Sequence, residues 1–364
     1  MEPRTKKKIQ LLSRIPGFHK HYRLSGKAAP YPVNITISLL YSCNSRCMTC
    51  NVYEKRVNNF TVEEYAKTFK NIGEAPYWFT FSGGEPFLRK DIVDCIKAAY
   101  DHCKPGIINI PTNGSLYKVI PGRVEEMIKY CKDSDIIINL SLDDIGENHD
   151  KIRGFPGNWE RAMQTYEELN KLRKYPNFTL GIHTVISNFN VDKFPEIYSE
   201  LIKMNPDSYI TEIAEERVEL GTMEEPITPS SAKYHKAIDF LVGEMKKNKL
   251  TGVAKIAQSF RLEYYAMVKK YLMQDKQIIP CFAGITSCQI SPDGDVWPCC
   301  IRADSMGNLR EHNFDFKKVW NSRSAGKIRK SIKNRECACP LANASYTNLL
   351  VSPKSLTKVV SRLV

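Results

Sequence analysis

Three cysteines lie close together in the first part of the chain, at Cys43, Cys47 and Cys50, with the spacing C-x3-C-x2-C. They follow an apolar run at residues 33–40 that is typical of a buried strand. Three thiolates on one short loop can bind three irons of a cubane cluster and leave the fourth iron open to a further ligand. A zinc ion would normally need a fourth Cys or His, and none is close by in the sequence. The spacing therefore favours an iron–sulfur cluster over zinc.

Polar residues also follow the next two strand-like runs. Gly83 and Gly84 come just after the run at residues 77–81, and adjacent glycines let a backbone approach a ligand closely. Glu85 beside them can accept hydrogen bonds from an ammonium group. Asn113 belongs to a Thr-Asn-Gly stretch after the third run, where an ordinary turn explains the pattern equally well.

Charged residues follow the later runs. Arg153 comes after Ser141, which ends the fourth run, and its planar guanidinium suits both oxygens of a carboxylate. His183 in the fifth run is either a hydrogen-bonded core histidine or a pocket residue. Glu212 and Glu215 end the sixth run. They belong to a solvated acidic loop, or they bind substrate and transfer protons.

Apolar, β-branched runs alternate with amphipathic helical patterns over most of the chain. The predicted strands are residues 33–40, 77–81, 107–110, 136–142, 179–186 and 209–213. The predicted helices are residues 62–71, 92–102, 123–131, 159–173, 195–204 and 231–248, the first opening with a capping box from Thr61 to Glu64. Six successive βα units predict an α/β fold, a partial (β/α)6 TIM-like barrel with its active site at the carboxyl ends of the strands.

The remaining segments are distinguished by composition. The predicted barrel covers residues 32–250, a helical linker follows at residues 251–280, and residues 281–340 form a small cysteine-rich α+β module. Residues 1–31 are a basic extension and residues 341–364 a basic amphipathic tail. Such helices usually dock on their own domain, and otherwise they lie on anionic membranes.

Overall composition limits the class of protein. No apolar stretch approaches the ~20 residues of a membrane span. The N-terminus has a basic start without a sustained apolar region, so a secretory signal is not expected. These features predict a cytoplasmic protein, at most peripheral to a membrane. The net charge of +13 indicates either an anionic partner or a solvated basic surface. No signature of a specific nucleic-acid module is visible.

Three motifs together resemble the radical S-adenosylmethionine superfamily over about residues 33–340: the loop SCNSRCMTC, the Gly-Gly-Glu-Pro stretch, and the run SLD…HDKIRG. Two positions depart from the family pattern. Thr49 stands where an aromatic residue usually precedes the third cysteine, and Asp144 stands where glycine is common. The three cluster cysteines are nevertheless all present.

The resemblance implies a [4Fe–4S] cluster whose open iron chelates S-adenosylmethionine. It implies reductive cleavage to methionine and a 5′-deoxyadenosyl radical, which removes a hydrogen atom from a substrate. A ferredoxin- or flavodoxin-like donor would supply the electron. The residues implied to contact the cofactor are Gly83, Gly84, Glu85, Asn113, Ser141 and Arg153.

The C-terminal cysteines resemble the auxiliary-cluster extensions called SPASM and twitch, which have a C-x-x-G start, a G-x-V-x-P-C hairpin and a later close cysteine pair. The resemblance implies a second, auxiliary [4Fe–4S] cluster on Cys281, Cys299, Cys337 and Cys339, with Cys300 as the rival of Cys299. Six cysteines are fewer than two auxiliary clusters use, so one cluster is expected. A structural zinc site on four thiolates is the alternative.

The substrate is left open by the sequence. A peptide or protein, a lipid-linked molecule and a small metabolite all remain candidates. Outside catalysis, the alternative is an iron–sulfur electron-transfer or binding protein that performs no radical chemistry.

Overall fold

One eight-stranded sheet organises the chain. The computed structural model describes residues 3–24, 29–248 and 250–363. The strands lie in the order β6-β5-β4-β3-β2-β1-β7-β8, and all neighbours are parallel except β7 and β8. Their bounds are β1 (Asn34–Ser38), β2 (Trp78–Ser82), β3 (Ile107–Thr112), β4 (Asp135–Ser141), β5 (Phe178–Ile186), β6 (Ser208–Ile213), β7 (Ser287–Ile290) and β8 (Val296–Trp297).

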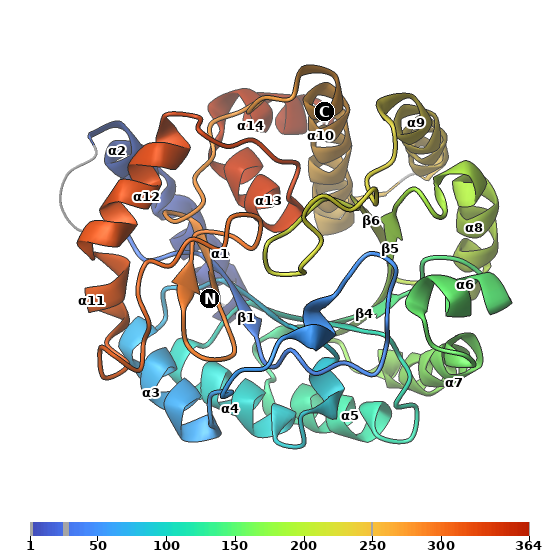
Figure 1. Cartoon of the computed structure of the whole chain (residues 1–364), viewed down its shortest axis with the longest axis horizontal. Helices are drawn as coiled ribbons and strands as arrows, with labels where there is room; N and C mark the ends of the chain where they lie inside the picture. Colours follow the sequence, from blue (N-terminus) through green and yellow to red (C-terminus); the bar gives the residue numbers. More distant parts are fainter. Residues whose placement is uncertain (1–2, 25–28, 249, 364) are drawn as a thin grey trace.

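Helices surround this sheet, as Figure 1 shows. They are α1 (Pro3–Ser13), α2 (Ile15–Leu24), α3 (Val62–Ile72), α4 (Ile92–Cys103), α5 (Ile120–Tyr130), α6 (Gly146–Arg153), α7 (Asn158–Asn170), α8 (Phe194–Leu201), α9 (Ser231–Lys247), α10 (Gly252–Gln274), α11 (Phe316–Trp320), α12 (Arg323–Lys333), α13 (Ala342–Val351) and α14 (Pro353–Ser361). The predicted α/β class and partial barrel are confirmed, because the curled parallel sheet does not close on itself.

Local sequence explains the well-predicted elements. Every residue of β1 is buried, as expected for a parallel strand covered by helices on both sides. The Thr61 hydroxyl accepts a hydrogen bond from the Glu64 backbone N–H (3.3 Å), and the Glu64 carboxylate accepts one from the Thr61 N–H (2.8 Å). This is the predicted capping box at the start of α3. The predicted helix at residues 159–173 instead becomes 3₁₀ over its last turn.

The C-terminal cysteine-rich region continues the barrel sheet. Strand β7 pairs with β1 over four residues, Asn34 with Ser287 through Ile37 with Ile290. Strand β8 then returns antiparallel to β7. The auxiliary hairpin is therefore hydrogen-bonded directly to the strand that precedes the first cysteine group.

Two C-terminal helices and α10 pack beside the open edge of the barrel. The Asn343 carbonyl on α13 accepts a hydrogen bond from the side-chain amide of Asn34 on β1 (3.2 Å). On the other side, the hydroxyl of Thr211 on β6 donates to Tyr265 on α10 (3.1 Å). Most of the predicted linker is thus one helix, α10, which packs against β6.

The basic ends pack against the protein. On α14, Val359 is buried, and Lys358 and Arg362 pair with the buried Glu263 of α10 at 2.8 and 3.0 Å. On α2, Phe18 is fully buried and Tyr22 stacks on Phe282 with ring centroids 4.5 Å apart. Residues 1–2 and 25–28 of the predicted extension and residue 364 of the predicted tail lie outside the described residues. Among the helices of the described ranges, none is long and apolar enough to cross a membrane.

Candidate active site

A cavity of about 440 Å³ occupies the interior of the partial barrel. The structure places all twelve first-site candidates around it: Cys43, Cys47, Cys50, Gly83, Gly84, Glu85, Asn113, Ser141, Arg153, His183, Glu212 and Glu215. They come from the loops and strand ends after β1 to β6. Parallel strands bring these distant segments to one edge, where catalytic residues gather in barrel enzymes.

The glycine pair holds the cysteine loop close to the end of β2. The Gly84 N–H donates to the Leu40 carbonyl (2.7 Å), and the Glu85 N–H donates to the Ser42 carbonyl (3.1 Å). A Cβ atom on Gly84 would lie 2.1 Å from the Ser42 oxygen, and one on Gly83 would lie 2.2 Å from the Leu40 oxygen. Neither position can carry a side chain unless the cysteine loop moves.

Glu85 is more engaged with the protein than the sequence predicted. One carboxylate oxygen accepts from the Thr112 hydroxyl (2.8 Å) and the Phe87 N–H (3.1 Å), and the other from the Asn113 N–H (2.8 Å). Three of about four acceptor sites are therefore used, which leaves room for one donor from a ligand. Burial raises the pKa of Glu85, and these donors oppose that effect.

Asn113 also supports the cysteine loop. Its side-chain amide donates to the Asn44 oxygen (2.8 Å) and to the Ser45 hydroxyl (2.9 Å). Its side-chain oxygen accepts from the Ser115 N–H (2.9 Å). The predicted direct contact with a cofactor therefore competes with a positioning role for this amide.

Arg153 places a buried positive charge beside the cluster cysteines. Its Nη1 lies 3.7 Å from the Cys47 sulfur, and its Nε lies 3.1 Å from Asp143. Burial disfavours the charged form, but Asp143 and Cys47 outweigh it and raise the pKa of Arg153 above its ordinary value. The Nη2 group has neither a hydrogen-bond partner nor an ion-pair contact within the described part of the chain. It is available to a ligand carboxylate.

The end of α6 is fixed to the cysteine loop. The Arg46 N–H donates to the Arg153 carbonyl (2.9 Å), and the Met48 N–H donates to the Ile152 carbonyl (2.8 Å). Gly154 follows with a φ of 55°, and a Cβ atom there would lie 2.2 Å from the Arg46 oxygen. Glycine is required both by this backbone conformation and by the close approach.

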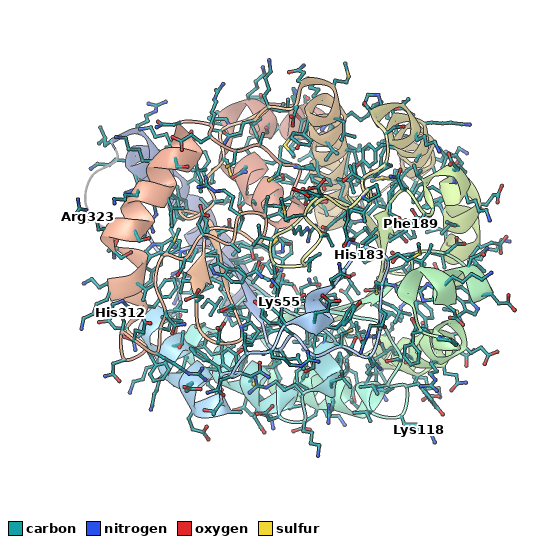
Figure 2. All side chains as sticks on the ribbon, viewed as in Figure 1. Lys55, Lys118, His183, Phe189, His312 and Arg323 are labelled. Carbon is teal, nitrogen blue, oxygen red and sulfur yellow. The ribbon has the colours of Figure 1, made fainter. Side chains whose placement is uncertain are left out.

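A charged cluster occupies the β5–β6 side of the cavity. The guanidinium of Arg217 lies 3.1 Å from both Glu212 and Glu215, and His183 Nε2 lies 3.5 Å from Glu212. Figure 2 shows His183 inside the ring of helices. Burial raises the pKa of Glu215 to about 7. Burial acts the same way on Glu212, but His183 and Arg217 outweigh it and lower the pKa of that carboxyl. The residues are therefore not a solvated loop.

Some cavity residues carried no usable sequence signal. Trp78 and Asn139 lie within predicted strands, while Arg261 and Tyr346 come from α10 and α13. The strand residues look like ordinary strand formers, and the helical ones lie outside the segment recognised as a barrel. Only the packing of α10 and α13 against the open edge brings them to the cavity.

The auxiliary cysteines divide into four neighbours and one outlier. Burial raises the pKa of the Cys339 thiol, and the nearby Cys299 and Cys281 raise it further. Burial also raises the pKa of the Cys299 thiol, and Cys281 and Cys337 raise it further. Burial raises the pKa of the Cys300 thiol as well, but the next largest effects on this pKa come from Arg217, which lowers it, and Glu219, which raises it. The choice of Cys299 over Cys300 as a ligand stays a prediction.

The donor sets fit sulfur-ligated clusters. Burial raises the pKa of the Cys43 and Cys50 thiols to about 11 and about 12, so their thiolates require a positive partner such as iron. Arg153 supplies further positive charge at the same place. Within residues 3–24, 29–248 and 250–363, no group of three or more His, Cys, Asp or Glu side chains is placed to hold a single metal ion. The three loop cysteines border the large cavity.

A parallel partial barrel with three cysteines at its carboxyl end, joined to a cysteine-rich hairpin, defines a class of iron–sulfur enzyme. The family description "Radical SAM superfamily" matches residues 37–201, and the SPASM "Iron-sulfur cluster-binding domain" matches residues 281–340. The chain belongs to the radical S-adenosylmethionine superfamily, in the group that carries a SPASM domain. It is an enzyme of this family that binds a [4Fe–4S] cluster with S-adenosylmethionine, and its SPASM domain binds auxiliary iron–sulfur.

Two curated relatives are similar over most of the chain. An AdoMet-dependent heme synthase of Methanosarcina barkeri (strain Fusaro / DSM 804) is 24% identical, covering 80% of this chain and 82% of the relative. A cysteine-type anaerobic sulfatase-maturating enzyme of Clostridium novyi (strain NT) is 22% identical, covering 83% and 82%.

Solved structures show the same fold. Streptococcus suis SuiB bound to S-adenosylmethionine has a TM-score of 0.62 at 17% identity, covering 82% of this chain and 68% of SuiB. SuiB bound to its precursor peptide SuiA has the same score and identity, covering 85% and 68%. The likeness concerns the fold, because the sequences have diverged widely.

Proposed function

We propose that this enzyme reductively cleaves S-adenosylmethionine and uses the resulting 5′-deoxyadenosyl radical to remove a hydrogen atom from a substrate in the barrel cavity. The observation that carries the proposal is the convergence of Cys43, Cys47 and Cys50, the glycine pair and Arg153 on that cavity. The cofactor would carry the radical chemistry, so the residues of this chain position the cofactor, hold the substrate and exclude water.

The residues divide this task between binding and support. We assign the free Nη2 group of Arg153 to the cofactor carboxylate, and the remaining acceptor site of Glu85 to the cofactor's amino group. Asn113 and the glycine pair keep the cysteine loop in place. Ser141, the last residue of β4, lines the cavity, where its hydroxyl can contact the ribose.

The electron has to come from another protein. A ferredoxin- or flavodoxin-like donor is the proposed reducing partner, since the thiol-bound cluster must be reduced by one electron before cleavage. The net charge of +13 suits the acidic surface of such carriers.

We propose one auxiliary cluster on Cys281, Cys299, Cys337 and Cys339. The mutual electrostatic influence of these four thiols supports the set, whereas the largest electrostatic influences on Cys300 come from Arg217 and Glu219. A cavity of about 40 Å³ bordered by Cys281, Cys337 and Cys339 lies beside it.

The proposal is tested by product analysis under anaerobic conditions. Reconstituted protein with dithionite and S-adenosylmethionine should release 5′-deoxyadenosine, and Cys47→Ala should abolish the release. Cys95→Ala is the matched control, because Cys95 is a buried thiol in α4, away from the cavity. Wild-type protein with a full cluster and no 5′-deoxyadenosine would contradict the proposal and favour an electron-transfer or binding protein.

A further inference from the structure

Unpaired polar atoms concentrate in the cavity. In the described part of the chain, fifteen buried side-chain nitrogen or oxygen atoms have no hydrogen-bond partner, and eight of them belong to residues that line this cavity. Two belong to Arg153: Nη2, and Nε, which lies 3.1 Å from Asp143 in an ion pair. The other six are Trp78 Nε1, Asn139 Oδ1, His183 Nε2, Glu215 Oε2, Arg217 Nε and Tyr346 Oη. Buried polar atoms in folded proteins nearly always bond to protein atoms or to ordered water, so the atoms lining this cavity can bond to a ligand or to the water that it displaces.

The cavity extends well below the cysteine loop. Trp78 and Ser82, the first and last residues of β2, both line it. Four residue steps along a strand correspond to roughly 13 Å. Ile107 and Ser208, the first residues of β3 and β6, also line the lower part. Cofactor binding at the carboxyl ends therefore leaves an inner chamber for the substrate.

The inner wall is built from neutral hydrogen-bonding groups. The Asn139 amide donates to the Asn109 oxygen (2.6 Å), so the unpaired Asn139 atom is an acceptor. Asn139 is itself 6% exposed. Trp78 contributes an N–H from β2, and Tyr346 a hydroxyl from α13. Three separate elements thus present unpaired donors and acceptors to one space.

The mixture of donors and acceptors limits the chemistry of the ligand. Trp78 Nε1 can only donate and Asn139 Oδ1 can only accept, while the Tyr346 hydroxyl can do both. A carboxylate satisfies only donors, and an ammonium group satisfies only acceptors. An apolar macrocycle would leave all of these atoms unpaired. Several hydroxyl groups on one molecule satisfy them together.

The charges of the cavity wall point the same way. Glu212 and Glu215 are opposed by Arg217 and Arg261, so the wall beyond the cofactor contacts is nearly balanced in charge. A strongly charged substrate has no excess of opposite charge to bind.

We infer that the inner chamber binds a polyhydroxylated, sugar-like substrate, with Trp78, Asn139 and Tyr346 as its hydroxyl-binding residues. The inference rests on the proposed function, because it assigns the substrate of the same cavity. Sites built to bond hydroxyl groups discriminate strongly against molecules that lack them.

The test measures binding without turnover. Oxygen-free holoenzyme saturated with S-adenosylmethionine, and given no reductant, is titrated by calorimetry with methyl α-glucopyranoside, maltose and myo-inositol. Glycylglycine and coproporphyrin III represent the peptide and tetrapyrrole classes. Because no radical forms without a reductant, a failure of this experiment is separate from a failure of 5′-deoxyadenosine release.

Variants locate the binding. Trp78→Phe and Tyr346→Phe keep an aromatic ring and remove one hydrogen-bonding group each. Each substitution should lower the affinity for the tightest-binding polyhydroxylated probe at least ~10-fold, because a buried hydrogen bond to the probe is lost. Tyr65→Phe is the matched control, because the Tyr65 hydroxyl is also buried and unpaired but does not line the cavity. It should leave the affinity unchanged.

Three outcomes would overturn the inference. One is the absence of binding by every polyhydroxylated probe at about 10 mM, a concentration that would saturate a site with a dissociation constant of about 1 mM. Another is tighter binding of glycylglycine or coproporphyrin III than of any polyhydroxylated probe. The third is an equal loss of affinity in Tyr346→Phe and Tyr65→Phe.

Discussion

The two cysteine groups differ in how they are supplied and in what surrounds them. Cys43, Cys47 and Cys50 come from one loop and face a cavity of about 440 Å³. The four proposed auxiliary thiols come from three separate segments, and three of them, Cys281, Cys337 and Cys339, border a space of only about 40 Å³. In the proposed assignment, the first group supplies three thiolates and leaves one iron open, while the second group supplies all four thiolates. An open site can bind a reactant, whereas a closed site is suited to structure or electron transfer.

Both groups nevertheless have an arginine beside one sulfur. Arg153 lies 3.7 Å from Cys47, and Arg302 lies 3.7 Å from Cys337. The side chain of Arg153 is 11% exposed and held by Asp143, while that of Arg302 is 24% exposed and pairs with Asp304. The buried arginine should therefore matter far more to its site than the partly exposed one.

The largest effects are expected from substituting one cysteine in each group, because each substitution should remove only one of the two clusters. Cys47→Ala should remove the first cluster, reduce 5′-deoxyadenosine to background and retain the auxiliary iron. Cys337→Ala should lose the auxiliary cluster and keep cleavage of S-adenosylmethionine, because the open iron belongs to the other site. Iron and sulfide analysis beside product quantification checks this. Equal loss of cleavage in both variants would contradict a division of labour.

Replacement of the arginines should sharpen the comparison. Arg153→Gln leaves the buried Asp143 without its positive partner, which typically destabilises by about 3–5 kcal/mol. It should also weaken binding of S-adenosylmethionine. Arg302→Gln should lower the free energy of unfolding by only about 0–1 kcal/mol, because its partner Asp304 is partly exposed. Anaerobic urea unfolding and calorimetry of cofactor binding measure both effects, and similar losses in the two variants would refute the contrast.

Glu215 should make stability depend on pH. Its pKa in the folded protein, about 7, exceeds the ordinary 4.5, so the folded state holds a proton that the unfolded state has released between these values. Stability from this group is therefore present below about pH 4.5 and is lost as the pH rises to about 7. The loss is on the order of 3 kcal/mol, since one pKa unit corresponds to about 1.4 kcal/mol.

Glu215→Gln should abolish this pH dependence. The unfolding free energy is compared at pH 5 and pH 7.5 in both proteins. The quantity to compare is the change in unfolding free energy between pH 5 and pH 7.5. If this change is the same in the wild-type protein and in Glu215→Gln, the carboxyl of Glu215 is ionised at both pH values and the prediction is wrong.

The smallest effect is expected at the C-terminal helix. Lys358→Ala removes a partly exposed partner of Glu263 while Arg362 remains. The loss should be about 0.5–1 kcal/mol, the usual range for such pairs. A thermal unfolding midpoint lowered by more than a few degrees would mean that α14 contributes more to the barrel edge than this pair suggests.

The sequence predicted the barrel well because the relevant signals are local. Apolar runs, the capping box at Thr61 and the cysteine spacing all lie within short stretches of chain. Pairing between β1 and β7 joins residues about 250 positions apart, and nothing in either strand specifies it. Likewise, Tyr346 and Arg261 reach the cavity only because α13 and α10 pack beside the open edge.

Residue roles were harder to predict than residue positions. Glu85 and Asn113 lie at the cavity as expected, but most of their bonding capacity is used within the protein. The spacing of a motif shows where a side chain goes. Its free hydrogen-bonding capacity depends on neighbours from other strands, such as Thr112 and Asn44.

Electron paramagnetic resonance of the Cys337→Ala protein tests the central claim most directly, because only the cluster on Cys43, Cys47 and Cys50 should remain. The dithionite-reduced protein should give one [4Fe–4S] signal that changes on addition of S-adenosylmethionine, as the open iron gains a ligand. A signal that does not respond to S-adenosylmethionine, or no cluster at all, would contradict the account.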